Sequence, residues 1–142
     1  TDALASAIDI LSTGNVLGIF PEGTRSKRTE PPFLLQGKTG VARIASSMPD
    51  VPVIPVAHKG TREIMAPKTD KIPKVWKGAS FNFGVPITWL EWLGDENGGG
   101  QNAATLGELV QKGEEEIRSA HAKLCRKFTD QFMQSLVVLG AP

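Results

Sequence analysis

The chain has 142 residues, within the usual size range of one folded domain. Hydrophobic residues make up 40% of it and charged residues 22%, which excludes the weakly hydrophobic, highly charged class of disordered proteins. The net charge is only +1, whereas a nucleic-acid-binding domain is normally basic overall. No apolar run approaches the roughly 20 residues that span a bilayer, so any membrane contact of this stretch is expected to be peripheral.

The charge is unevenly distributed along the chain. Residues 1–77 carry a net +4, and residues 78–142 carry −3. This asymmetry predicts one anion-attracting face in the first half of the chain. A single cysteine, Cys125, excludes an internal disulfide, and its place on an apolar helical stripe predicts a small buried hydrophobe.

The first half of the chain alternates between helical and strand patterns. Apolar residues at i, i+4 and i+7 predict a helix over residues 2–11. The apolar run Val16–Phe20 is bounded by turn residues, as a strand buried on both faces is. Polar and helix-breaking residues over 21–32 predict a loop, and helical spacing returns over residues 38–48.

Two further strands and a C-terminal helix are predicted. Val51–Ala57 is a second apolar β run, interrupted by prolines that cannot donate ladder hydrogen bonds. Side chains alternate over Ser80–Ile87, which predicts a third strand. After glycines 98–100, Thr105 and Glu108 have capping-box spacing and begin an apolar stripe that predicts one long amphipathic helix ending near Gly140.

This order of elements predicts an α/β fold with a mostly parallel sheet flanked by helices. We expect three regions, namely the C-terminal portion of a larger domain over 1–95, a glycine-rich linker over 96–104 and a helix over 105–142.

One segment, Phe-Pro-Glu-Gly-Thr-Arg-Ser at residues 20–26, has the composition of a ligand-binding loop. It follows a predicted strand, where open α/β sheets place their ligands. Pro21 fixes the exit from the strand, and Gly23 permits close approach of the backbone to a ligand. Glu22 would repel a phosphate, so we expect it to orient Arg25 or to accept a hydrogen bond from a substrate hydroxyl.

The donors of this segment favour an anionic ligand. Arg25 offers a planar fork of donors that suits a phosphate, and Lys27 and Arg28 extend the positive field. Thr24 and Ser26 add neutral donors. From composition alone, a strand followed by a solvated, charged loop is the commoner interpretation.

Several blocks of the sequence resemble the 1-acylglycerol-3-phosphate (lysophosphatidic acid) acyltransferases of the glycerolipid acyltransferase superfamily. Residues 20–26 look like the third signature block of that family, and Val51–Val56 looks like the fourth, at the expected distance. Gln36–Ala42 resembles the lysine- and glycine-rich helix start between them, and Gly60–Glu63 and Gly84–Ile87 also fit. Two specific blocks in the right order are much stronger than either alone.

The resemblance covers about residues 2–90 and implies roles for individual residues. It implies a phosphate-binding set that consists of Glu22, Gly23, Thr24, Arg25 and Ser26. It also implies that Pro52 and Pro55 shape the acyl or acceptor pocket. No cluster of side chains has metal-ligand spacing.

The catalytic pair of the family, His-x-x-x-x-Asp, has no counterpart at the expected place. His121 has no acid at the required offset, and His58, with Glu63 at that offset, lies downstream of the phosphate motif instead of upstream. We therefore expect no catalytic residue in this stretch and predict the pair upstream of Thr1, with this stretch inactive by itself.

The resemblance implies an enzyme that transfers a fatty acyl group from acyl-CoA or acyl-carrier protein to lysophosphatidic acid, which gives phosphatidic acid in phospholipid biosynthesis. It implies no bound cofactor, no nucleic acid, and peripheral attachment to the cytoplasmic face of a membrane. A non-catalytic lipid-phosphate-binding module and a remodelling acyltransferase for another lysophospholipid remain alternatives.

Four lysines recur at every third residue, at Lys68, Lys71, Lys74 and Lys77, with Trp76 among them. A solvated basic loop is the favoured interpretation, and a surface that contacts anionic lipid is the alternative.

Overall fold

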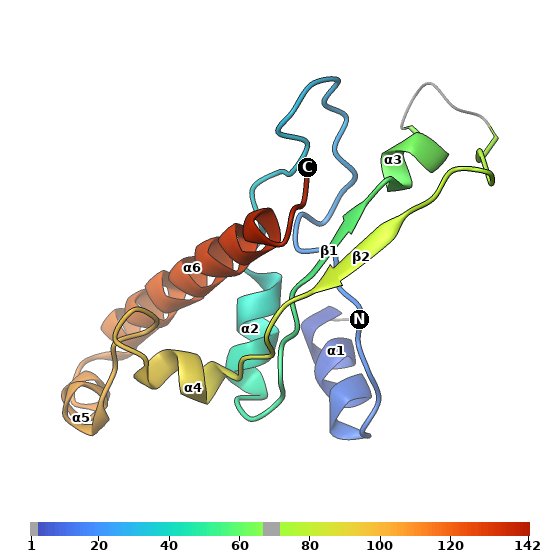
Figure 1. The fold of residues 1–142 in the computed structure, drawn as a ribbon. Helices are drawn as coiled ribbons and strands as arrows, with labels where there is room; N and C mark the ends of the chain where they lie inside the picture. Colours follow the sequence, from blue (N-terminus) through green and yellow to red (C-terminus); the bar gives the residue numbers. More distant parts are fainter. Residues whose placement is uncertain (1–2, 67–71) are drawn as a thin grey trace.

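The computed structural model describes residues 3–66 and 72–142 of the chain. Helices dominate these residues, and a two-stranded sheet lies to one side of them (Figure 1). In chain order the elements are α1 (Ala3–Ser12), α2 (Gly40–Ser47), β1 (Val56–Lys59), α3 (Thr61–Ile64), β2 (Ser80–Phe83), α4 (Trp89–Gly94), α5 (Ala103–Val110) and α6 (Glu114–Val138).

Helices α1 and α2 lie where helical spacing predicts them. Helix α2 buries Val41, Ala42 and Ala45, which share one face because they are three and four residues apart. It packs against α1 on one side and against α6 and α4 on the other. The small alanines let these neighbours approach closely, so α2 is the central element of the helical part (Figure 1).

The sheet is antiparallel, not parallel as predicted. Strands β1 and β2 pair with Val56 opposite Phe83 and His58 opposite Phe81. The pairing resumes at an isolated bridge, where the backbones of Val53 and Ile87 exchange both hydrogen bonds. The predicted strands at 51–57 and 80–87 are therefore present in shortened form, and the part of the chain that the structure describes contains no parallel pair.

The predicted strand Val16–Phe20 is wrong, because these residues form a loop. Val16 is 94% exposed and Phe20 is 75% exposed, so the run is not buried on either face. A strand requires a neighbour for its ladder hydrogen bonds, and within residues 3–66 and 72–142 no other segment pairs with this one. A run of hydrophobic residues does not show whether a partner strand exists to pair with it.

The hydrophobic core lies where α2, α4 and α6 meet. Thr88 caps α4, since its hydroxyl accepts the Glu91 N–H and the Glu91 carboxylate accepts the Thr88 N–H. Trp92 donates from its indole to Gln131 of α6 at 2.6 Å. The buried cluster consists of Ala42, Ala45, Trp89, Trp92, Cys125 and Phe128. The sequence pattern did not predict α4, because six residues are too few to show a helical period.

The C-terminal region contains two helices instead of one. Asn102 is the N-cap of α5 and forms its capping box with Thr105, so the predicted box of Thr105 with Glu108 is wrong. The break at residues 111–113 precedes α6, which begins after Gly113. Helix α6 is the expected long amphipathic helix, but it begins at Glu114 and not at residue 105. It buries Cys125, Phe128, Thr129, Met133 and Leu136.

The glycines predicted to form a linker pack closely against α4. A side chain on Gly98 would meet the Trp92 carbonyl oxygen at 2.2 Å, and one on Gly99 would meet the Leu93 carbonyl oxygen at 2.7 Å. Both glycines are buried. They allow the chain to turn tightly from α4 toward α5.

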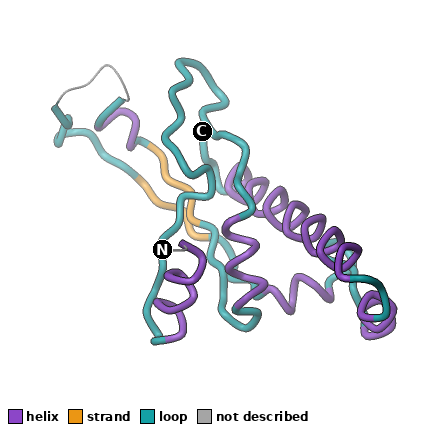
Figure 2. The backbone as a smooth tube through the Cα atoms, turned by 180° about the vertical axis from the view of Figure 1, so that it is seen from behind, coloured by secondary structure: helices purple, strands orange, loops and turns teal. Residues whose placement is uncertain are grey.

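The two faces of the sheet differ in what covers them. On one face Asn82 donates to the carbonyl of Leu139 at 2.8 Å, just beyond α6, and Ala57 is buried. On the other face, Val56, Phe81 and Phe83 are exposed. Figure 2 shows the two strands beside the helices rather than beneath them. The sheet therefore has one covered face and one open apolar face. Within the described residues, no helix is both long and apolar enough to cross a bilayer.

Candidate functional site

The candidate site lies in the segment Pro21–Gln36, which we call the cationic loop, between α1 and α2. The loop starts with a tight turn, in which the Gly23 N–H donates to the Phe20 carbonyl at 2.9 Å. Gly23 has a φ of 68°, in the left-handed region that glycine adopts without steric cost. The sequence therefore forms a turn at the point where the motif predicted close backbone approach.

Two hydrogen bonds close the base of the loop. The Glu22 carboxylate accepts the Leu35 N–H at 2.7 Å, and the Lys38 N–H donates to the Pro21 carbonyl at 2.8 Å. Thirteen positions separate Glu22 from Leu35, so this contact brings the two arms of the loop together. Among the described residues, no hydrogen bond or ion pair joins Glu22 to Arg25.

The Arg28 side chain forms hydrogen bonds within the cationic loop itself. Its guanidinium donates to the carbonyls of Pro32 at 2.7 Å and Leu34 at 3.2 Å. Arg62, at the start of α3, donates to the Arg28 carbonyl and lies 4.2 Å from the centre of the Phe33 ring. These contacts hold the far end of the loop against α3.

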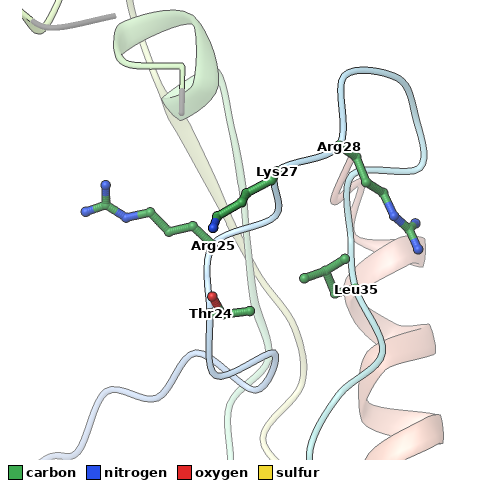
Figure 3. Close-up of a pocket in the computed structure, with 5 residues that line it drawn as sticks. All are labelled: Thr24, Arg25, Lys27, Arg28 and Leu35. Carbon is green, nitrogen blue, oxygen red and sulfur yellow. The ribbon is translucent and has the colours of Figure 1, made fainter. Parts of the chain in front are cut away.

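An open cleft of about 420 Å³ lies on the loop, lined by Thr24, Arg25, Lys27, Arg28 and Leu35. Figure 3 shows the Arg25 and Arg28 side chains extending to opposite sides, so their guanidinium groups do not converge. Within the described residues, neither the Arg25 guanidinium nor the Lys27 ammonium has a hydrogen-bond or ion-pair partner. Both cations are available to an anion that enters from solvent.

Lys38 adds a cation that sequence analysis did not assign to the site. A Cβ atom placed on Gly23 would lie 3.0 Å from the Lys38 ammonium nitrogen, so this side chain lies over the turn. Thr24 is exposed beside it, whereas Ser26 is half-buried and does not line the cleft. The signal in the sequence was the lysine between two glycines, at residues 37–40, just before α2.

The prolines predicted to shape a pocket do not line this cleft. Pro55 is buried against Gly84, whose N–H donates to the Pro55 carbonyl at 2.8 Å. Pro52 is exposed. Pro55 has no N–H to return the hydrogen bond from Gly84, so the ladder is weakened between β1 and the Val53–Ile87 bridge.

Both histidines contact hydroxyl groups. His58 Nδ1 lies 2.9 Å from the Thr61 hydroxyl, and the imidazole also contacts the Phe20 ring edge to face. His121 Nε2 lies 3.0 Å from the Ser46 hydroxyl. In the part of the chain that the structure describes, neither histidine bonds to a carboxylate and no cluster of side chains could hold a metal ion.

Residues 1–59 match the family model described as Acyltransferase. The matched segment includes α1, the cationic loop, α2 and β1. This match supports the glycerolipid acyltransferase superfamily and acyl transfer as the general activity. Comparisons with curated proteins and with solved structures found no match.

Proposed function

We propose that the cationic loop binds the phosphate of lysophosphatidic acid, and that the protein transfers a fatty acyl group to the free hydroxyl of this acceptor. The observation that carries the proposal is the pair of unpartnered cations, Arg25 and Lys27, beside Thr24 in an open cleft. The cleft lies in the segment that matches the acyltransferase family. A phosphate monoester suits this arrangement, because a guanidinium, an ammonium and a hydroxyl all donate to its oxygens.

The proposed reaction forms an ester from a thioester. The acceptor hydroxyl loses its proton to a general base, its oxygen attacks the thioester carbonyl of acyl-CoA or acyl-carrier protein, and the carbon–sulfur bond breaks. The thiol leaves with a proton, and the product is phosphatidic acid. The base would be the histidine of the pair predicted upstream of Thr1. This stretch contributes the grip on the phosphate, which aligns the hydroxyl with that base.

The proposal assigns tasks to the other predicted residues. Glu22 uses its carboxylate to accept the Leu35 N–H and so fixes the turn that carries Thr24 and Arg25. Pro52 and Pro55 would stiffen the chain that shapes an acyl or acceptor pocket, apart from the cationic cleft. Because the acceptor is a lipid, the protein would work at the cytoplasmic surface of a membrane.

Replacing Arg25 tests the phosphate grip. Arg25→Ala should weaken binding of lysophosphatidic acid about tenfold, since one charge-assisted hydrogen bond is lost. Isothermal titration calorimetry on the 142-residue chain measures this affinity. Arg118→Ala is the matched control, because Arg118 is an exposed arginine of α6 and should leave the affinity unchanged. Equal affinity of Arg25→Ala and the parent chain would contradict the proposal.

A second candidate is a lipid-phosphate-binding module without catalysis, because within the described residues neither histidine bonds to a carboxylate that would orient it as a base. Acyl transfer by the 142-residue chain should be compared with transfer by a chain extended to include a His-x-x-x-x-Asp block. Activity of the extended chain alone supports the enzyme, and binding without activity in both supports the module. Transfer to other lysophospholipids in preference to lysophosphatidic acid would indicate a remodelling enzyme.

A further inference from the structure

Three large apolar side chains are exposed together in the segment between α3 and β2. Ile72 is 77% exposed, Val75 is 82% exposed and Trp76 is 76% exposed. The other two tryptophans, Trp89 and Trp92, are at most 5% exposed. The core therefore accepts tryptophan readily, and the exposure of Trp76 is particular to its segment.

Backbone contacts hold this segment in place. The Lys74 N–H donates to the Ile64 carbonyl of α3 at 2.7 Å, and the Lys77 N–H donates to the Lys74 carbonyl at 3.0 Å. At its base Gly60, with a φ of 82°, passes so close to Gly78 that a Cβ atom would lie 2.3 Å from the Gly78 carbonyl oxygen. The exposed apolar side chains thus belong to a segment, residues 72–78, that a backbone hydrogen bond holds to α3.

The segment of residues 72–78 lies at one end of the molecule and is basic. Figure 1 shows α3 and the chain that leads into β2 at the end of the molecule farthest from α5. Lys74 and Lys77 stand among the apolar residues of this segment, and residues 72–78 contain no aspartate or glutamate. Lys68 and Lys71, which belong to the same lysine series, lie outside the described residues.

We propose that Ile72, Val75 and Trp76 insert into the interface of a membrane that contains anionic lipids. The indole favours the headgroup level, where its ring is apolar and its N–H can meet a polar partner. Lys74 and Lys77 attract the anionic headgroups, and their long aliphatic stems can lie along the acyl boundary. This inference rests on the proposed function, since a lipid acceptor gives the protein its reason to reach a bilayer.

A bilayer fits these residues better than a protein partner does. Three side chains cover far less than the about 800 Å² that each partner contributes to a standard protein interface. Insertion of an apolar tip requires no such area, because each methylene that enters the boundary adds to the affinity independently.

Trp76 makes the test direct, because its fluorescence responds to insertion while Trp89 and Trp92 stay in the core. The 142-residue chain is mixed with vesicles of phosphatidylcholine and phosphatidylglycerol, without lysophosphatidic acid or an acyl donor. A blue shift of the emission and quenching by brominated lipid are expected. Both should vanish in Trp76→Phe. A parent chain without shift or quenching would overturn the proposal.

Matched variants separate insertion from simple charge attraction. Val75→Ala should weaken vesicle binding about tenfold, because it removes methyl groups from the inserted side chain. Val110→Ala is the control, since Val110 is 75% exposed on α5 at the other end of the molecule. Lys77→Gln should weaken binding about fivefold, and Lys112→Gln should not. Full binding by Val75→Ala would overturn insertion.

Vesicle binding can be measured separately from ligand binding at the proposed phosphate site. Val75→Ala should still bind the water-soluble acceptor fragment glycerol 3-phosphate as the parent chain does. Loss of vesicle binding with intact glycerol 3-phosphate binding is the expected pattern. Absence of vesicle binding in a parent chain that binds glycerol 3-phosphate overturns this inference alone, and the reverse pattern overturns the proposed function alone.

Discussion

Glu22 shows how one carboxylate can shape the proposed phosphate site without contacting the ligand. Its carboxylate accepts the Leu35 N–H from the returning arm of the loop, so its charge is partly engaged by the protein. The turn at Gly23 then presents Thr24 and Arg25 to solvent. A carboxylate in this position shapes the loop, while Arg25 and Lys27 make the electrostatic potential at the cleft positive.

Substitutions at Glu22 separate the structural part of this role from any contact with substrate. Glu22→Ala should lower the free energy of unfolding by about 1 kcal/mol, since the Leu35 N–H loses its acceptor. Glu22→Gln keeps an acceptor oxygen and should retain most of the stability. Urea unfolding measures both, with Glu30→Ala as the control for an exposed glutamate of the same loop. Equal stability of Glu22→Ala and the parent chain would show that the bond contributes nothing.

Cys125 is the other residue whose surroundings dictate its chemistry. Burial raises the pKa of the Cys125 thiol, and the hydrogen bond with Ser46 and the charge of Arg43 act more weakly in the opposite direction. The thiol should therefore stay protonated in the folded protein and react slowly with thiol reagents until the chain unfolds.

The raised pKa of Cys125 also predicts how stability varies with pH. Below the ordinary pKa of a thiol, both the folded and the unfolded chain keep the proton, so the thiol's contribution is complete. Above it the unfolded chain releases the proton first, and the free energy of unfolding falls as pH rises. In Cys125→Ala the free energy of unfolding should fall less steeply at alkaline pH. Denaturant titrations at several pH values measure this alkaline decrease. An unchanged alkaline decrease would show that Cys125 does not cause it.

At the scale of elements, Gly37, which directly follows the cationic loop, lies against α6. A Cβ atom there would lie 2.7 Å from Cγ of Met133 and 2.9 Å from a methyl of Thr129, and both of these residues are buried in α6. The Gly37 carbonyl accepts a hydrogen bond from Arg126 at 2.8 Å. Glycine at this position therefore allows the base of the loop to rest directly on α6.

Gly37→Ala should destabilise the protein by about 1–3 kcal/mol, the usual cost of overpacking a close contact. Gly40→Ala is the control, because a side chain at Gly40 meets nothing within 4 Å and alanine favours the helix that begins there. Thermal unfolding of the two variants compares them directly. A neutral Gly37→Ala would mean that Met133 moves aside without cost.

The elements also show what local sequence can and cannot predict. Helices α1 and α2 were predicted because their periodicity is local, and the strands that became β1 and β2 were predicted for the same reason. The run Val16–Phe20 has the composition of a strand, but strand formation depends on a partner that no local pattern can supply. The start of α6 was missed because Gly113 lies on the apolar stripe, where it looked like one more helical position.

The candidate site was predictable as a set of residue types but not as a geometry. The spacing of the motif placed Thr24 and Arg25 in a loop, and both line the cleft. The sequence could not show that Arg28 bonds to carbonyls of its own loop, nor that Lys38 lies over Gly23. Those contacts depend on how the loop folds back on itself.

At the scale of the whole molecule, the buried core and the open sheet face lie in different places. The core joins α2, α4 and α6. The open face carries Val56, Phe81 and Phe83, and Phe20 lies against the same side through its contact with His58. An exposed apolar cluster of this kind is uncommon on a soluble monomer and tends to bind apolar molecules.

The open face should bind an anilinonaphthalene sulfonate dye in the native state. Phe83→Ser should reduce the dye fluorescence markedly and change the free energy of unfolding little, because Phe83 is already exposed. Val110→Ser removes an exposed apolar side chain of α5, at the other end of the molecule, and should leave the fluorescence unchanged. Dye fluorescence that does not respond to Phe83→Ser would place the binding elsewhere.

The hydrogen bond from the Leu34 N–H to the Pro142 carbonyl has a practical meaning for anyone who handles the protein. Leu34 lies next to Leu35, which lines the cleft, so a group attached at residue 142 lies close to the candidate site (Figure 1). A bulky group joined to Pro142 would therefore disturb the arm of the cationic loop that carries Leu35. A small fluorophore attached there would act as a built-in sensor of ligands that enter the cleft.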